Sequence, residues 1–106
     1  MTTTKLKTSR RQSRLRFESL NAFVDTGMAD LSRAELAVWM ILWRDTQRNG
    51  VARASLDDLA RRGGMDRQTA SRAVGRLARR KMLQVLRRRG VICGPSTYRV
   101  FPFAME

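Results

Sequence analysis

The 106-residue chain carries 22 Lys and Arg against 9 Asp and Glu, a formal net charge of +13, and 42% of its residues are hydrophobic. This length and apolar content fit one domain with a modest core. A single Cys excludes an intrachain disulfide, the absence of His removes the usual zinc ligands, and no apolar run approaches the length of a membrane span.

The positive charge is concentrated at the two ends of the chain. Residues 1–16 and 67–105 contain Lys and Arg but no acid, whereas eight of the nine acids lie between Glu18 and Asp66. A charge needed only for solubility does not require such segregation. The pattern therefore favours a polyanionic partner such as nucleic acid.

The N-terminal segment divides into a basic arm and a short helix. Residues 1–16 hold almost no large apolar side chains, which predicts a flexible arm. Such an arm can follow phosphates, enter a minor groove or serve as a nonspecific basic tail, and the sequence does not separate these roles. Residues 17–24 carry an apolar stripe at helical spacing, and Gly27 is expected to end this helix.

The next segment predicts a helix that is apolar on two faces. Ser32 followed by Glu35 is a capping box, and Asn49-Gly50 is expected to close the helix. A helix of this kind must be covered on two sides. The two faces comprise Leu36, Trp39, Met40 and Trp43, and Val38, Ile41 and Leu42.

Residues 51–54 predict a short strand, and two further helices follow it. Ser55 and Asp66 are expected to cap them, and Gly63-Gly64 separates them. A glycine inside a helix costs about 1 kcal/mol relative to alanine, so the pair indicates a tight turn rather than one long helix. The inward set of the last helix is Ala70, Ala73, Val74 and Leu77.

The C-terminal part changes to a strand pattern. Residues 84–89 and 96–101 are rich in β-branched and aromatic side chains, and a glycine-rich turn separates them. They predict a small β-hairpin.

The order of elements, together with the segment LDDLARRGGMDRQTASRAVGRLARRKML, resembles the winged helix-turn-helix domains of bacterial, phage and plasmid regulators and replication initiators. The resemblance covers residues 31–101 and departs from the family pattern at Met65-Asp66 and at Lys81. The matching positions are Leu59-Ala60, Gly63-Gly64, Thr69, Ser71, Val74, Leu77, Arg79-Arg80 and Leu83.

The resemblance implies a mainly α fold with a small β-hairpin. We expect a winged helix-turn-helix domain over residues 17–106, with a three-helix core, an extra N-terminal helix and a two-stranded wing. The helix-turn-helix would occupy residues 55–80 and the wing residues 84–101.

A recognition helix over residues 66–80 would present its polar face to the major groove of DNA. Arginine binds guanine bidentately and glutamine binds adenine, which favours Gln68 and Arg72 for base contacts. The free N–H groups at the start of a helix suit phosphates. A basic wing suits the backbone or the minor groove. The expected DNA-binding residues are Arg67, Gln68, Thr69, Ser71, Arg72, Arg76, Arg79, Arg87, Arg88 and Arg89.

The residues thus predict a sequence-specific double-stranded DNA-binding protein, a transcription regulator in the first place. The DNA-binding module of a plasmid or phage replication initiator, an RNA-binding winged-helix protein and a protein–protein adaptor remain alternatives. An enzyme is least favoured, because no His, metal-ligand set or nucleophile beside a base is present. No cofactor, metal, small-molecule ligand or membrane partner is expected.

Surplus apolar surface predicts a homodimer. Its interface would involve residues 17–24, the outer side of residues 32–47, and Phe101, Phe103 and Met105. We expect a cytoplasmic protein that is nucleoid-associated when bound to DNA.

Overall fold

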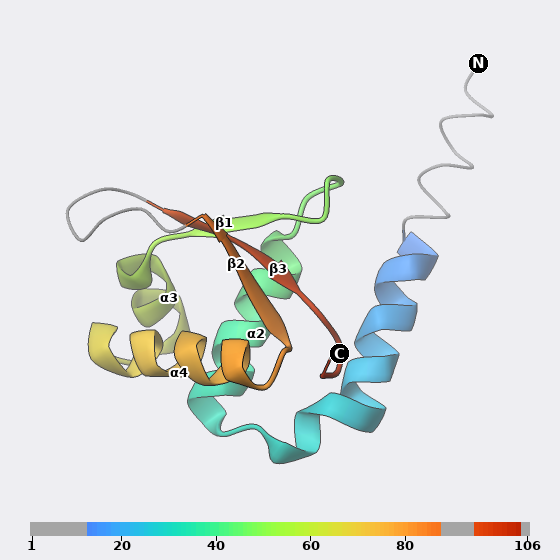
Figure 1. Cartoon of the computed structure of the whole chain (residues 1–106), viewed down its shortest axis with the longest axis horizontal. Coiled ribbons are helices and arrows are strands. Elements are labelled where there is room, and N and C mark those ends of the chain that lie inside the picture. Colours follow the sequence, from blue (N-terminus) through green and yellow to red (C-terminus); the bar gives the residue numbers. More distant parts are fainter. Residues whose placement is uncertain (1–12, 88–94, 105–106) are drawn as a thin grey trace.

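The computed structural model describes residues 13–87 and 95–104, which are mainly helical and include a small three-stranded antiparallel sheet (Figure 1). This architecture confirms the mainly α class predicted above. In chain order the elements are an N-terminal helix (residues 13–22), the π-helical turn η1 (Phe23–Gly27), the 3₁₀ turn η2 (Met28–Asp30), α2 (Arg33–Asp45), β1 (Ala52–Ala54), α3 (Leu56–Gly63), α4 (Arg67–Arg79), β2 (Leu83–Arg87) and β3 (Ser96–Val100).

The N-terminal segment differs from the prediction in two respects. Residues 13–16, assigned above to the arm, are helical, and residues 1–12 lie outside the described residues. Gly27 does not end the helical path, because η1 continues directly into η2. Glycine is needed there for close approach instead, since a Cβ at Gly27 would collide with the carbonyl oxygen of Pro102.

Arg16 connects the N-terminal helix to the C-terminal end of α2 through hydrogen bonds and a cation–π contact. Its guanidinium donates hydrogen bonds to the carbonyl oxygens of Thr46 at 3.2 Å and Trp43 at 3.4 Å, and lies 4.5 Å from the centroid of the Trp43 ring. One residue therefore donates to carbonyl oxygens at the end of α2 and makes a cation–π contact. Phe23 completes the attachment by stacking on Trp39 with ring centroids 3.6 Å apart.

Both ends of α2 follow from local hydrogen bonding. The Ser32 Oγ accepts a hydrogen bond from the Glu35 N–H at 3.2 Å, as the predicted capping box requires. The helix ends at Asp45, earlier than the Asn49-Gly50 pair suggested, and the Thr46 hydroxyl donates to the Leu42 carbonyl oxygen at 2.7 Å. Gly50 lies beyond the helix, in the turn before β1.

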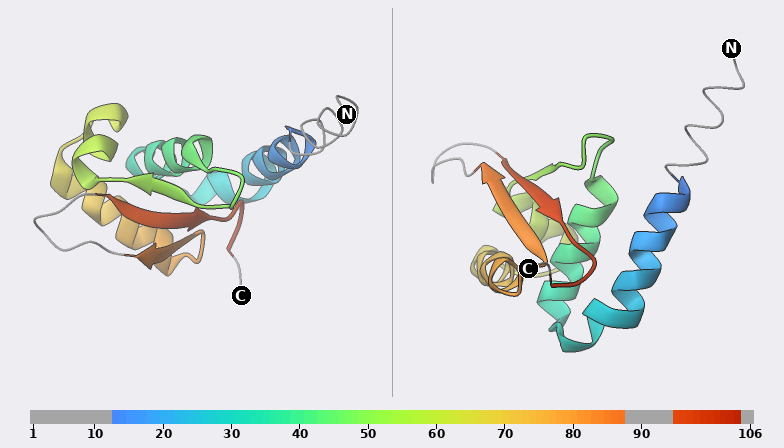
Figure 2. Two further views of the ribbon diagram at one scale, coloured as in Figure 1. Left: turned by 90° about the horizontal axis from the view of Figure 1, so that it is seen from above. Right: turned by 45° about the vertical axis from the view of Figure 1, so that its right-hand side comes forward.

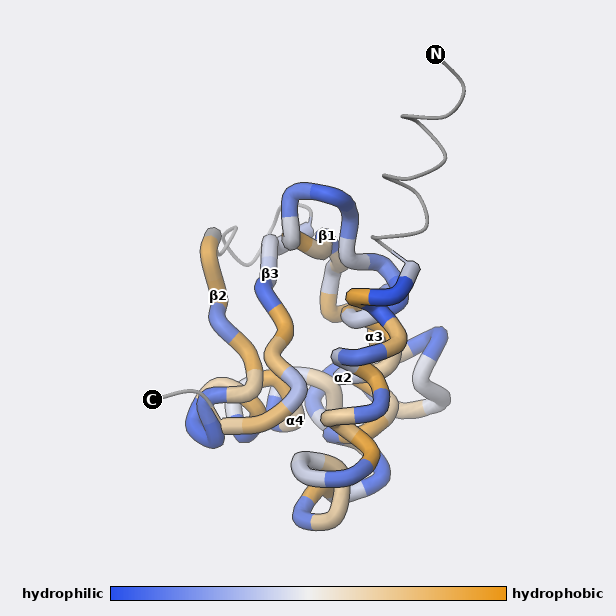
Figure 3. Tube along the Cα trace, turned by 90° about the vertical axis from the view of Figure 1, so that its right-hand side faces the viewer, coloured by the Kyte–Doolittle hydropathy of each residue, from blue (hydrophilic) through white to orange (hydrophobic). Residues whose placement is uncertain are grey.

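The sheet has the order β1-β3-β2, and both pairings are antiparallel. Ala52 lies opposite Tyr98, which lies opposite Val85, and a β-bulge follows Val85. Buried and exposed residues alternate along β1, and hydrophilic positions are interspersed with hydrophobic ones along β2 and β3 (Figure 3), as expected for a sheet with one buried face. The strand predicted at residues 51–54 is β1, which pairs with β3 and adds a strand to the predicted two-stranded hairpin.

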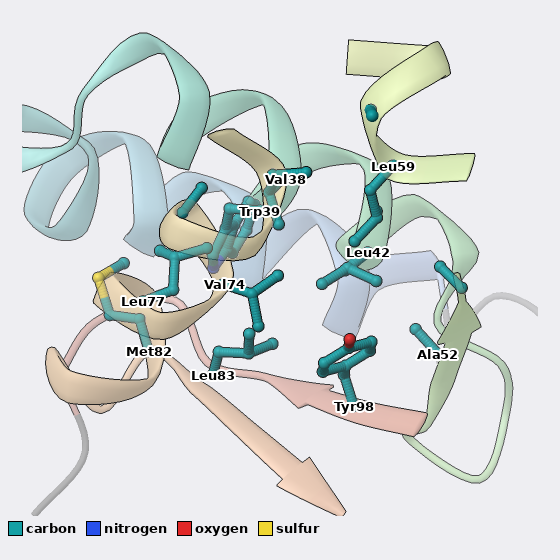
Figure 4. Packing of buried hydrophobic residues seen from close by; sticks show 14 of the residues in the cluster. Val38, Trp39, Leu42, Ala52, Leu59, Val74, Leu77, Met82, Leu83 and Tyr98 are labelled. Atoms are coloured by element: carbon teal, nitrogen blue, oxygen red, sulfur yellow. The ribbon is translucent and has the colours of Figure 1, made fainter. Parts of the chain in front are cut away.

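The core lies between the sheet and the helices (Figure 4). The inward set predicted for α4 is confirmed, because all four of its residues are buried. The N-terminal helix stands on the side of α2 opposite α4, so α2 is covered on two sides (Figure 2). The larger buried side chains are Phe23, Val38, Trp39, Leu42, Leu59, Val74, Leu77, Met82, Leu83 and Tyr98.

Candidate nucleic-acid interface

The turn between α3 and α4 explains the pair of glycines. Gly64 has φ +67, the left-handed conformation that glycine adopts at low cost, and the Met65 N–H donates to the Ala60 carbonyl oxygen at 2.9 Å. Gly63 allows close packing of the turn against α2, because a Cβ there would lie 2.6 Å from the Met65 Cε and 3.6 Å from the Cβ of Ala37 on α2. The turn therefore ends α3 abruptly and holds the start of α4 close to it.

Asp66 occupies the N-terminus of α4. Its Oδ1 accepts a hydrogen bond from the Thr69 N–H at 2.6 Å. Hydrogen bonds from the Thr69 side chain and backbone lower the pKa of this carboxyl, so it is charged at neutral pH. The Thr69 N–H is consequently engaged within the protein, and Arg67 Nε lies 3.6 Å from Asp57 Oδ1.

The outward surface of α4 is polar and basic. Of the residues predicted to bind DNA, the structure places six on this helix in exposed positions and leaves Thr69 half-buried. A Cβ added at Gly75 would meet no atom within 4 Å, so there is open space beside the middle of this surface. The six exposed residues are Arg67, Gln68, Ser71, Arg72, Arg76 and Arg79.

Carboxylates elsewhere in the fold engage the neighbouring arginines. Arg62 donates to Asp45 at 2.6 and 3.0 Å and to Asp58 at 3.1 Å, and Arg61 donates to Asp58 at 2.6 Å. The hydrogen bond from Arg62 lowers the pKa of Asp45, and that from Arg61 lowers the pKa of Asp58. These arginines on α3 are therefore neutralised by α2 and α3 themselves.

The arginines on the outer face of α4 lack such partners. No carboxylate of residues 13–87 and 95–104 forms an ion pair with Arg72, Arg76 or Arg79. In addition, α4 itself contains no Asp or Glu. Its outer face consequently presents uncompensated positive charge to solvent.

Sequence reasoning missed the contact that holds the far end of α4. Arg80 Nε lies 2.7 Å from Glu35 Oε2, and Glu35 is only 2% exposed. The capping box identified Glu35, but it gave no sign that the second oxygen of this carboxylate would bind an arginine at the end of α4. Lys81 follows with φ +61, where the family pattern often has glycine, and its N–H donates to the Ala78 carbonyl oxygen at 3.0 Å.

The predicted wing is described only at its base. Arg87 ends β2 and lies opposite Thr97 in the register, one residue beyond the bulge. Arg88 and Arg89, which the sequence also assigned to DNA binding, lie outside the described residues, as does the turn that connects the two strands.

A pocket of about 170 Å³ lies between the N-terminal helix, α2 and the end of β3, away from α4, and Arg16, Trp39 and Trp43 are among its lining residues. Residues 13–87 and 95–104 hold no cluster of His, Cys, Asp and Glu able to bind a metal. Among the same residues, no helix combines the length and apolarity needed to cross a membrane.

A scan against protein-family models matches none to this chain, and a search of the curated proteins likewise finds no match.

Proposed function

We propose that this protein binds double-stranded DNA by placing α4 in the major groove. The observation that carries the proposal is the basic face of α4, where Arg72, Arg76 and Arg79 are exposed and form no ion pair with a carboxylate of the described residues. Phosphate neutralisation by such residues supplies most of the affinity of DNA-binding proteins.

The neighbouring residues supply candidates for base recognition. Gln68 and Arg72 lie one turn apart on the exposed side of α4, and both side chains suit purine edges in the major groove. The tight turn at Gly64 and the packing of α4 on α2 and α3 agree with a helix-turn-helix arrangement. Together with the resemblance noted in the sequence, they support a winged helix-turn-helix protein acting as a transcription regulator, with the basic wing and arm on flanking DNA.

Duplex DNA is favoured over RNA because of the shape of the grooves. The deep, narrow major groove of A-form RNA does not admit a helix, whereas that of B-DNA does. The exposed side of α4 carries short or flexible side chains and the open position Gly75, which suit close approach to a groove.

The test is fluorescence anisotropy with a labelled random 30-bp duplex at several salt concentrations. We expect sub-micromolar binding at low salt with a steep salt dependence, and an Arg72→Gln/Arg79→Gln variant should bind at least tenfold more weakly. The matched control is Arg44→Gln/Arg61→Gln, which removes the same charge from two exposed arginines that already face carboxylates. Equal losses in the two variants, or no binding by the wild type, would contradict the proposal.

We further propose that the protein forms a homodimer through the N-terminal helix. Phe17 and Val24 of this segment are 65% and 49% exposed, whereas Phe23 faces α2. A Phe17→Ser/Val24→Ser variant should sediment as a 12.2 kDa monomer, and the wild type as a species of twice that mass. These substitutions spare Phe23, which is fully buried, so they test the interface without removing core residues. A monomeric wild type would refute the dimer.

A further inference from the structure

We propose that the outer face of the three-stranded sheet is a second phosphate-binding surface, which holds a second DNA duplex while α4 holds the first. The proposal rests on the proposed function, because it assumes that α4 binds DNA. It concerns residues on β1 and β3 that belong to neither the recognition helix nor the turn of the wing.

The register of the sheet places two arginines on one face. Arg53 on β1 lies directly opposite Thr97 on β3, and directly opposed residues share a face of an antiparallel pair. Arg99 lies two residues beyond Thr97 along the same strand and therefore projects from the same face. Both arginines are exposed, whereas their neighbours Ala52 and Tyr98 are buried on the opposite face.

The surface around these arginines is polar and lacks acids. Gln84 of β2 lies opposite Arg99 and is exposed. Arg99 lies beside the turn that precedes β1, since a Cβ at Gly50 would be 3.8 Å from its Nε, and this turn also contains the exposed Arg48. None of the three strands contains Asp or Glu.

The charge on this face is uncompensated, as it is on α4. Within the described ranges no carboxylate pairs with Arg48, Arg53 or Arg99, although the carboxylates of Asp45, Asp57 and Asp58 all pair with other arginines. A carboxylate-free array of guanidinium groups on a β surface is complementary to a phosphate backbone.

The position of the sheet argues for a second duplex rather than the same one. The buried residues of the sheet point towards the helices, so its outer face is directed away from the layer that contains α4 (Figure 4). DNA has a persistence length of about 150 bp, and a short duplex docked on α4 resists bending around the domain to reach the sheet. A separate segment meets no such resistance.

The experiment compares three variants that each lose two positive charges: Arg53→Gln/Arg99→Gln on the sheet, Arg72→Gln/Arg79→Gln on α4, and Arg44→Gln/Arg61→Gln as the control. The first measurement is anisotropy with a labelled 16-bp duplex. The second is capture of that labelled duplex by an unlabelled 16-bp duplex on beads, with full-length protein as the bridge. Each variant is also made in the Phe17→Ser/Val24→Ser background, so that a dimer cannot join two duplexes through two α4 helices.

We expect the sheet variant to bind one duplex within about threefold of the control while its capture falls at least fivefold. Capture by the sheet variant equal to that of the control overturns the inference, and so does a wild type that binds the duplex without capturing the second one. In both cases the proposed function stands. A wild type that binds no duplex at all overturns the proposed function itself.

Discussion

Arg80 Nε lies 2.7 Å from Glu35 Oε2, and this single ion pair joins the N-terminal turn of α2 to the C-terminal end of α4. Glu35 also accepts a hydrogen bond from the Ser32 hydroxyl at 3.0 Å, so its carboxylate is held from two sides. Because Glu35 is buried and Arg80 is 39% exposed, the pair lies at the edge of the core. The contact fixes the end of the helix that we propose to enter the groove.

Removal of Arg80 is expected to destabilise the fold. Arg80→Ala leaves a buried carboxylate without its cation, and we expect a loss of about 2 kcal/mol in the free energy of unfolding, less than for a fully buried pair because Arg80 is partly exposed. Urea denaturation followed by tryptophan fluorescence measures this loss. Arg79→Ala, one residue away and exposed, should change the unfolding free energy by less than 0.5 kcal/mol, a bound taken from typical surface substitutions. Equal effects of the two changes would show that the ion pair contributes nothing.

Local signals in the sequence predicted most of the fold. The caps at Ser32, Ser55 and Asp66 each accept the hydrogen bond expected from the backbone three residues later. Such signals work because the atoms involved lie within one helical turn. The inward side of α4 was predictable for a similar reason, since apolar residues three and four positions apart share a face.

Contacts between distant segments were not predictable in this way. Arg16 was assigned to a flexible arm because its neighbours in the sequence are polar, and nothing nearby indicates that it caps α2 and covers Trp43. The same holds for Glu35 and Arg80, which are 45 residues apart. The basic face of α4 was visible in the sequence, whereas that of the sheet required the register of Arg53 against Thr97.

Gly64 and Lys81, which follow α3 and α4, both have a left-handed backbone conformation, and substitutions at the two positions should change stability in opposite directions. Gly64→Ala introduces a Cβ at φ +67 and should destabilise the protein by about 1 kcal/mol. Lys81→Gly removes a Cβ at φ +61 and should stabilise the protein by about 1 kcal/mol. Thermal unfolding by circular dichroism measures both. Gly63→Ala is the control for added volume, because it mainly displaces the flexible end of Met65. A loss of stability in Lys81→Gly would mean that the lysine side chain makes a stabilising contact.

Arg16 should determine whether the N-terminal helix stays attached. Arg16→Ala removes the hydrogen bonds to the carbonyl oxygens of Thr46 and Trp43 and the cation–π contact, with an expected cost of about 1 kcal/mol. Limited proteolysis should then cleave within residues 13–22 faster than in the wild type. Arg14→Ala is the matched control, since Arg14 forms an exposed pair with Glu18 of its own helix at 3.9 Å. Unchanged cleavage would show that the Phe23–Trp39 stack alone holds the helix.

Acid should weaken the fold through the carboxylates that Arg61 and Arg62 bind. The pKa values of Asp45 and Asp58 lie below the ordinary 3.8, so these groups stabilise the folded state above that value and cease to do so as the pH falls through their folded-state pKa. Unfolding free energy should therefore be flat between about pH 5 and 7 and decline below about pH 4. Arg62→Gln should cost about 1 kcal/mol at pH 7 and make the decline shallower. Arg79→Gln should leave the shape of the curve unchanged, and parallel curves for Arg62→Gln and wild type would refute the assignment.

Gly75 offers a test that separates folding from binding. A Cβ there meets no atom within 4 Å, and glycine inside a helix costs about 1 kcal/mol relative to alanine, so Gly75→Ala should raise the unfolding free energy by about 0.5 to 1 kcal/mol. Gly75→Leu should fold at least as stably as the wild type, because the space is open and leucine is a good helix former. If α4 enters the groove with this position facing DNA, the larger side chain should weaken binding of a 30-bp duplex at least tenfold in the anisotropy assay. Wild-type affinity in Gly75→Leu would place the bound DNA on another side of the helix.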